Sequence, residues 1–153
     1  ALIGGVLWGL CFSPEAFRWV PWVALVPFVL LLDRPDAVRL GWLFGFASWI
    51  TAIPWIAPTL VTFGGLSPWL AWPLLLLLAA YLGSYVGLFA WLARPVWRLR
   101  SPVWAFVGLP AIWVALDWVR AWMISRFPWN LAASAWIETP GALETSAWIG
   151  AYG

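Results

Sequence analysis

Residues 68–93, PWLAWPLLLLLAAYLGSYVGLFAWLA, form a long stretch without a charged side chain, centred on the leucine run Leu74–Leu78. A helix that crosses the hydrocarbon core of a bilayer, about 30 Å thick, needs about 20 mainly apolar residues. This stretch is long enough to cross, and it decides the fold class. We predict an all-α, polytopic transmembrane helix bundle.

The composition of the whole chain agrees with that class. Of its 153 residues, 65% are hydrophobic and 9% are charged, and the mean hydropathy is +0.91. A soluble domain is about 45–50% apolar and about 25% charged. The excess apolar surface must therefore face lipid. The 17 tryptophans favour membrane–water interfaces, where the indole has an apolar body and one N–H to satisfy.

Outward from residues 68–93, charged residues and prolines divide the chain into further apolar runs. We expect about five membrane helices, with the 40–60 run kinked near Pro54 and Pro58 because proline removes a backbone donor. The 130–147 segment, with two glutamates, a proline and a glycine, is expected to be interfacial or re-entrant, and 148–153 to begin a further helix. The other four expected spans are 2–12 (the end of a first helix or half of a hairpin), 19–32, 68–93 and 102–124.

The arginines predict an orientation, because cytoplasmic loops of membrane proteins are enriched in basic residues. Loops 33–39 and 94–100 together hold five arginines and are expected in the cytoplasm. Segments 13–18, 62–67 and 125–147 are then expected on the periplasmic side of a bacterial inner membrane.

Several kinds of chemistry are excluded by residue counts. The chain has no histidine, no lysine and one cysteine, Cys11. Disulfides, zinc or haem sites, Ser–His or Cys–His pairs and a lysine-containing phosphate loop are therefore not expected, and we predict no metal and no cofactor. Cys11 is interpreted as a small buried apolar residue. The net charge of +2, spread over scattered arginines, argues against nucleic-acid binding.

Small residues four apart predict close helix packing. They share one helix face and let two backbones approach closely, which favours packing within the bundle over a dimer motif. Tyr81 and Tyr85 have the same spacing, and we interpret them as core packing. The glycine pairs are Gly5/Gly9, Gly41/Gly45 and Gly83/Gly87.

Asp117 and Arg120 are the sharpest local signal, because they lie three apart on one face near the end of an apolar helix. Two interpretations stand side by side. In the first, Asp117 and Arg120 form a structural ion pair that reaches to the outer interface. In the second, the two residues are a polar anchor for a lipid head group or a neighbouring domain. Phe127-Pro128-Trp129 follows, and it either ends the helix as an interfacial anchor or shapes a lipid entry point.

Nine segments, in this order and over nearly the whole chain, together resemble the bacterial apolipoprotein N-acyltransferases. Each motif is weak alone, and the order and spacing carry the resemblance. The most specific are the last three. The segments are Leu10–Pro14, Gly41–Gly45, Pro54–Ile56, Thr62–Gly65, Leu78–Leu82, Gly87–Ala90, Pro110–Trp113, Asp117–Trp122 and Phe127–Trp129.

The resemblance implies that residues 1–153 are part of the N-terminal transmembrane domain of an enzyme of lipoprotein maturation. Such enzymes move a fatty acyl chain from a membrane phospholipid to the N-terminal diacylglyceryl-cysteine of an apolipoprotein. It also implies a nitrilase-like domain with a Glu–Lys–Cys triad after residue 153, so that no catalytic residue lies here and this segment alone is inactive. Asp117, Arg120, Phe127, Pro128 and Trp129 are the expected lipid-access residues.

Three alternatives remain open from the residues. A transporter or channel fragment would place polar residues at mid-bilayer on paired broken helices. A non-catalytic membrane anchor would need no further domain. An acyltransferase–glycosyltransferase fusion would share this membrane region. The sequence beyond Gly153 decides between an anchor and the membrane domain of an enzyme, and flux in liposomes would identify a transporter.

Overall fold

A computed structural model describes residues 1–13, 20–122, 126–137 and 139–152 of the chain. In these ranges every regular element is a helix, and none is a strand, which confirms the all-α prediction. The elements are α1 (Leu2–Leu10), α2 (Val20–Ala24), α3 (Val26–Leu30), η1 (Leu31–Asp33), α4 (Ala37–Ala52), α5 (Ile56–Thr62), α6 (Pro68–Arg98), η2 (Trp104–Gly108), α7 (Leu109–Trp122), η3 (Ala132–Trp136) and α8 (Ala142–Ile149).

Helix α6 is the longest element and contains the apolar stretch 68–93. Its 31 residues reach about 46 Å at 1.5 Å per residue, more than the thickness of a hydrocarbon core. Among the described residues, only this helix and Trp104–Trp122 are each long and apolar enough to cross a membrane. The pair α4 and α5, bent by 49° at the predicted Pro54 kink, makes a third candidate if it is one broken span.

The expected count of about five spans is not confirmed. Helix α1 has nine residues, and the apolar run at 20–33 is too short to pass as a span and is interrupted between α2 and α3. Pro27 lies in the first turn of α3, where its ring supplies no backbone N–H to continue the hydrogen-bond ladder of α2. Hydrophobic content alone did not reveal this break.

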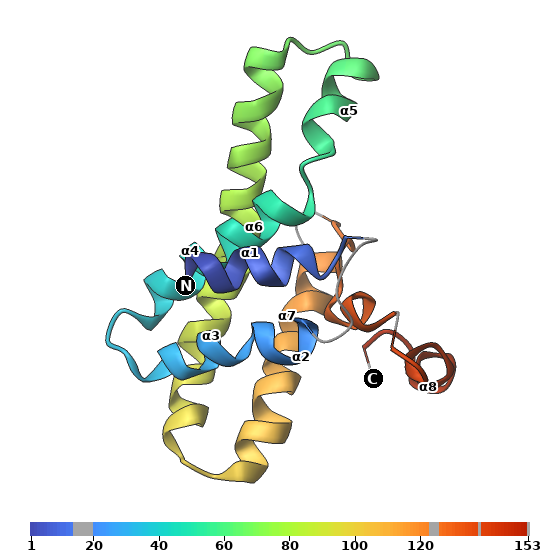
Figure 1. The fold of residues 1–153 in the computed structure, drawn as a ribbon. Coiled ribbons are helices and arrows are strands. Elements are labelled where there is room, and N and C mark those ends of the chain that lie inside the picture. The colour runs from blue at the N-terminus through green and yellow to red at the C-terminus, as the bar shows by residue number, and fades with distance from the viewer. Residues whose placement is uncertain (14–19, 123–125, 138, 153) are drawn as a thin grey trace.

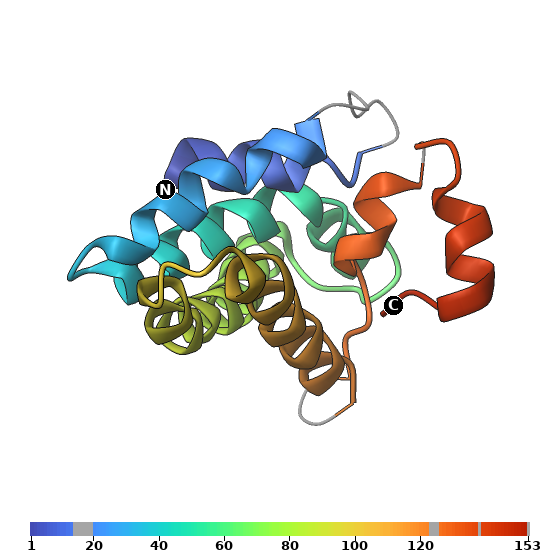
Figure 2. The ribbon, with the colours of Figure 1, turned by 90° about the horizontal axis from the view of Figure 1, so that it is seen from below.

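Helix α4 is the central layer of the bundle, with α1 packed on one side and α6 on the other. Figure 1 shows the long α6 with α7 beside its lower half, and Figure 2 shows α1 to α3 and α6 on opposite sides of α4.

The glycine pairs make both interfaces close. A Cβ placed on Gly5 or Gly9 would run into backbone carbonyls of α4, and one on Gly45 would lie 2.7 Å from Val86 Cγ2 in α6. A Cβ on Gly83 would lie 2.8 Å from the backbone nitrogen of Phe46. The three predicted pairs therefore pack helices within the chain, as expected.

Aromatic side chains fill the space between these layers. Phe28 of α3 stacks on Phe44 of α4 with ring centroids 4.6 Å apart, and Phe89 of α6 packs beside Phe28 at 5.8 Å. Cys11 is buried and its thiol donates to the carbonyl of Leu7, which confirms its predicted place in the core. Tyr85 shares a hydrogen bond of 2.9 Å with Tyr81, which packs on a core cluster.

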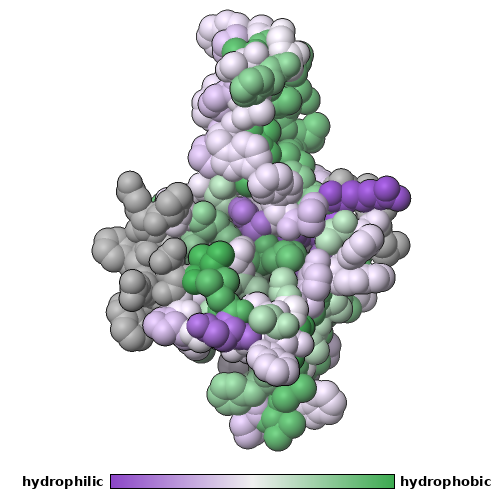
Figure 3. Space-filling model, turned by 90° about the vertical axis from the view of Figure 1, so that its right-hand side faces the viewer, coloured by the Kyte–Doolittle hydropathy of each residue, from purple (hydrophilic) through white to green (hydrophobic). Residues whose placement is uncertain are grey.

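The two basic loops meet at one end of the bundle. Arg100 Nη2 lies 2.9 Å from Asp33 Oδ1, which joins the 94–100 loop to the start of the 33–39 loop. A hydrogen bond from Arg34 holds the pKa of Asp36 below its usual value. The α5–α6 hairpin projects from the opposite end (Figure 1), and Figure 3 shows green and pale side chains on it, with the deep purple, hydrophilic ones on the body below.

The C-terminal part consists of short helices, in agreement with the prediction that 130–147 does not span. The helix expected to begin within 148–153 is not confirmed, because Trp148 and Ile149 form the end of α8. Gly150 follows with φ +73, a backbone conformation that stops a helix. The predicted segment at 13–18 lies, apart from Ser13, outside the described residues, as does Glu138.

The glycine packing makes a testable prediction within one motif. Gly83→Ala should lower the free energy of unfolding by about 1–3 kcal/mol, because the new methyl meets the backbone of α4. Gly87→Ala is the control, since its Cβ would meet Trp42 Cβ at an ordinary 3.4 Å. Thermal unfolding in detergent measures both, and equal losses would contradict close backbone packing as the role of Gly83.

Candidate functional site

Arg120 lies in the last turn of α7 and is buried, with 1% of its surface exposed. Its Nη2 lies 2.9 Å from Oδ1 of Asp117, one turn earlier on the same helix face. The predicted pairing is therefore present. The interpretation that the pair reaches out to the interface is wrong for Arg120, because the guanidinium points into the bundle and not along the helix towards water.

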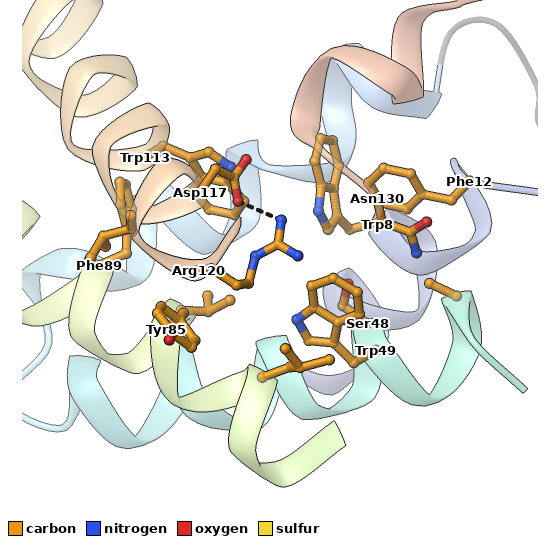
Figure 4. Close-up of a pocket in the computed structure, with 14 residues that line it drawn as sticks. Trp8, Phe12, Ser48, Trp49, Tyr85, Phe89, Trp113, Asp117, Arg120 and Asn130 are labelled. Carbon is orange, nitrogen blue, oxygen red and sulfur yellow. Dashed lines mark hydrogen bonds and ion pairs between the residues drawn. The ribbon is translucent and has the colours of Figure 1, made fainter. Parts of the chain in front are cut away.

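The guanidinium of Arg120 holds three segments together. Nη1 donates to the carbonyls of Phe127 at 2.9 Å and of Trp129 at 2.8 Å. Its Cζ also lies 4.9 Å from the centre of the Trp49 ring, a cation–π contact with α4. Figure 4 shows the guanidinium between Asp117 on one side and Trp49 on the other.

A buried charge persists only when its hydrogen bonds are satisfied, because taking an ion out of water costs several kcal/mol. Arginine suits this place because its planar fork can serve several acceptors at once and stack on an aromatic face. Asp117 is also engaged twice, since its Oδ2 accepts a longer hydrogen bond of 3.4 Å from the backbone N–H of Ala132. The pair thus also fixes the start of η3.

The Phe127–Trp129 segment is held in a constrained shape. Arg126 and Asn130, on either side of it, have φ of +46 and +52, in the left-handed region that side chains other than glycine rarely adopt. The two hydrogen bonds from Arg120 lie between these turns and stabilise the segment.

The outer surface of this segment is aromatic. Phe127 packs edge-on against Trp49 at 6.0 Å, and Trp129 lies 5.3 Å from Trp55 at the break between α4 and α5. Trp129 is 53% exposed and Pro128 is also exposed. The structure therefore brings all five predicted site residues together in two layers: Asp117 and Arg120 lie inside, and Phe127, Pro128 and Trp129 form the rim.

A small cavity of about 30 Å³ lies beside the pair, which is room for about one water molecule. Ser48 and Asn130 line it together with the pair, and Trp8 and Trp113 are among its aromatic walls. Sequence reasoning missed Trp49 and Ser48. One signal could have found Trp49, since it continues the four-residue spacing of Gly41 and Gly45 on one face of α4.

The described residues contain no group of three or more His, Cys, Asp or Glu side chains that could hold a metal ion. The buried Asp117–Arg120 pair can hold the rim in a fixed position.

Removing the charge of Arg120 should destabilise the protein. Arg120→Gln leaves Asp117 buried without its cation, so we expect the free energy of unfolding to fall by about 3–5 kcal/mol. Arg98→Gln, which alters an exposed arginine at the end of α6, should change it by less than about 1 kcal/mol. Chemical denaturation in detergent measures the difference, and a loss from Arg120→Gln as small as that from Arg98→Gln would disprove the structural role.

Comparison with known proteins identifies the relatives of this chain. The family model described as the apolipoprotein N-acyltransferase N-terminal domain matches residues 4–153. Proteins named apolipoprotein N-acyltransferase are 34% identical in Chromobacterium violaceum, over 92% of this chain, and 33% identical in Vibrio cholerae, over 89%. The relative from Geobacter metallireducens is 29% identical over 100% of the chain. The resemblance inferred from the motifs is confirmed.

The chain spans less than a third of these relatives. The matched region is 28% of the length of the first two and 30% of the third.

Proposed function

Because this chain belongs to the apolipoprotein N-acyltransferase family, we propose that it is the membrane platform of an enzyme that acylates bacterial lipoproteins. The acyl donor is a membrane phospholipid and the acceptor is the N-terminal diacylglyceryl-cysteine of an apolipoprotein. A nitrilase-like domain with a Glu–Lys–Cys triad follows residue 153 and carries the chemistry. The observation that supports this most is the match of the N-terminal domain model over residues 4–153.

The bundle suits that role because both proposed substrates carry acyl chains that lie in the same bilayer. A platform with an apolar exterior can bind acyl chains from the membrane and present them to a catalytic domain at the surface. We propose five membrane crossings in a bacterial inner membrane, with loops 33–39 and 94–100 in the cytoplasm. The ion pair between Asp33 and Arg100 supports a common side for these loops, and their arginines favour the cytoplasm.

The rim formed by Phe127, Pro128 and Trp129 is the proposed lipid entry point. Trp129 and Pro128 are exposed, and aromatic rings of this kind favour the head-group level of a membrane. Arg120 is a positioning residue, since its buried guanidinium acts on the entry point through the carbonyls of Phe127 and Trp129. Asp117 supports Arg120 in turn.

A double variant of the full-length protein tests the entry point. Arg120→Ala with Trp129→Ala should lower acyl transfer to a diacylglyceryl-lipopeptide by about tenfold to 100-fold, because the lipid would no longer be held in register. Trp148→Ala, which removes a tryptophan that is 90% exposed in α8, is the matched control. The assay compares equal amounts of protein in vesicles. Full activity of the double variant at normal expression would refute the proposed role of the rim.

The location of the catalytic domain has its own test. The parent gene, read beyond the codon for Gly153, should encode further membrane spans and then a nitrilase-like domain with Glu, Lys and Cys in that order. Continuation into helices without such a domain would contradict the acyltransferase proposal.

The break between α4 and α5 favours one other function. Broken helices line substrate paths in transporters, and this pair bends by 49°. A transporter would show solute flux in protein-containing liposomes, whereas an acyltransferase platform would not. Solute flux without acyl transfer would favour the transporter over the acyltransferase platform.

A further inference from the structure

A second cavity, separate from the rim, opens between α3, α6, α7 and η3. Its volume is about 550 Å³, within the range of pockets that bind small molecules. Its walls are almost entirely apolar, and Phe28, Val29, Phe106, Trp113 and Ala132 are among the side chains that form them. We call this cavity the α3–α7 groove.

The groove has the depth of one lipid tail. Along α7 its lining runs from Leu109 to Asp117, which corresponds to about 12 Å at 1.5 Å per residue, and it continues along η2 to Ala105. One leaflet contributes about 15 Å to the hydrocarbon core of a bilayer. Asp117 is the last residue of α7 in this lining, and its carboxylate is engaged by Arg120 and by the backbone N–H of Ala132.

The other end of the groove is basic. Trp97 lines it there, and Arg100 Cζ lies 5.8 Å from the centre of the Trp97 ring. Arg98 is exposed on the same loop. Arg98 and Arg100 both act electrostatically on Asp33, so two arginines stand against one aspartate at this end of the groove. The end of the groove is thus positively charged even with Asp33 in place.

We propose that the α3–α7 groove binds one acyl chain of an anionic phospholipid, with the phosphate beside Arg98 and Arg100. The lipid comes from the leaflet at the end of the bundle where the two basic loops meet. The apolar groove fits the acyl chain, and the arginines at its end fit the negatively charged phosphate. A zwitterionic lipid would place its acyl chain in the groove but would gain nothing from the net positive charge of the arginines. This site needs no acyl transfer, so it stands independently of the function proposed above.

Photo-crosslinking tests whether the α3–α7 groove binds an acyl chain. The full-length protein is placed in vesicles with a trace of phosphatidylglycerol that carries a diazirine in its acyl chain, and labelled peptides are mapped by mass spectrometry. We expect labelling of residues 105–114 and 132–136. Ala105→Trp, which fills the groove, should reduce that labelling several-fold, whereas Ala115→Trp, on the exposed face of α7, should not. Labelling unchanged by Ala105→Trp would overturn the proposal.

The role of Arg98 and Arg100 at the end of the groove is tested with the same probe, in variants that leave the groove itself unaltered. Arg98→Gln and Arg100→Gln should each weaken phosphatidylglycerol labelling about fivefold, the factor that one arginine contributes near a charged lipid surface. Arg126→Gln, an exposed arginine beyond the end of α7, is the matched control. Equal labelling by phosphatidylglycerol and phosphatidylethanolamine probes in the unmodified protein would show that the anionic head group is not recognised.

Discussion

A guanidinium buried in an apolar bundle must have its acceptors at fixed positions, and Arg120 imposes that requirement on three parts of the chain. It fixes Asp117 on its own helix, the carbonyls of Phe127 and Trp129 beyond the helix, and the ring of Trp49 in α4. Each partner lowers the cost of burying the charge, and each is held in place by it. The aromatic rim therefore owes its geometry to a charge that lies inside the bundle.

The layers of the bundle make that arrangement possible. Glycines let α1 and α6 approach α4 closely, which places Trp49 of α4 directly against the end of α7. Asp117 is the point where the two features of the molecule meet, because it pairs with Arg120 and also lines the α3–α7 groove. The buried Asp117–Arg120 pair thus lies between the aromatic rim and the apolar α3–α7 groove, whose other end is basic.

Much of this could be predicted where one local property determines the outcome. The length of the apolar run predicted α6, the glycine spacing predicted close helix packing within the chain, and the three-residue spacing predicted the pairing of Asp117 with Arg120. Properties set by distant contacts were missed. The direction in which Arg120 points depends on acceptors seven and nine residues away and on Trp49, so the pattern on α7 suggested an outward course. The count of about five spans was not confirmed, because hydropathy does not register the interruption at Pro27.

The central claim is that Arg120 fixes the segment from Phe127 to Ala132. Hydrogen exchange measured by mass spectrometry on the full-length protein in detergent tests it most directly, by comparing the natural protein with the Arg120→Gln variant. We predict faster exchange in peptides that cover residues 126–132, with a smaller increase in α6. If both segments exchange as in the natural protein, Arg120 does not hold the rim and the claim is wrong.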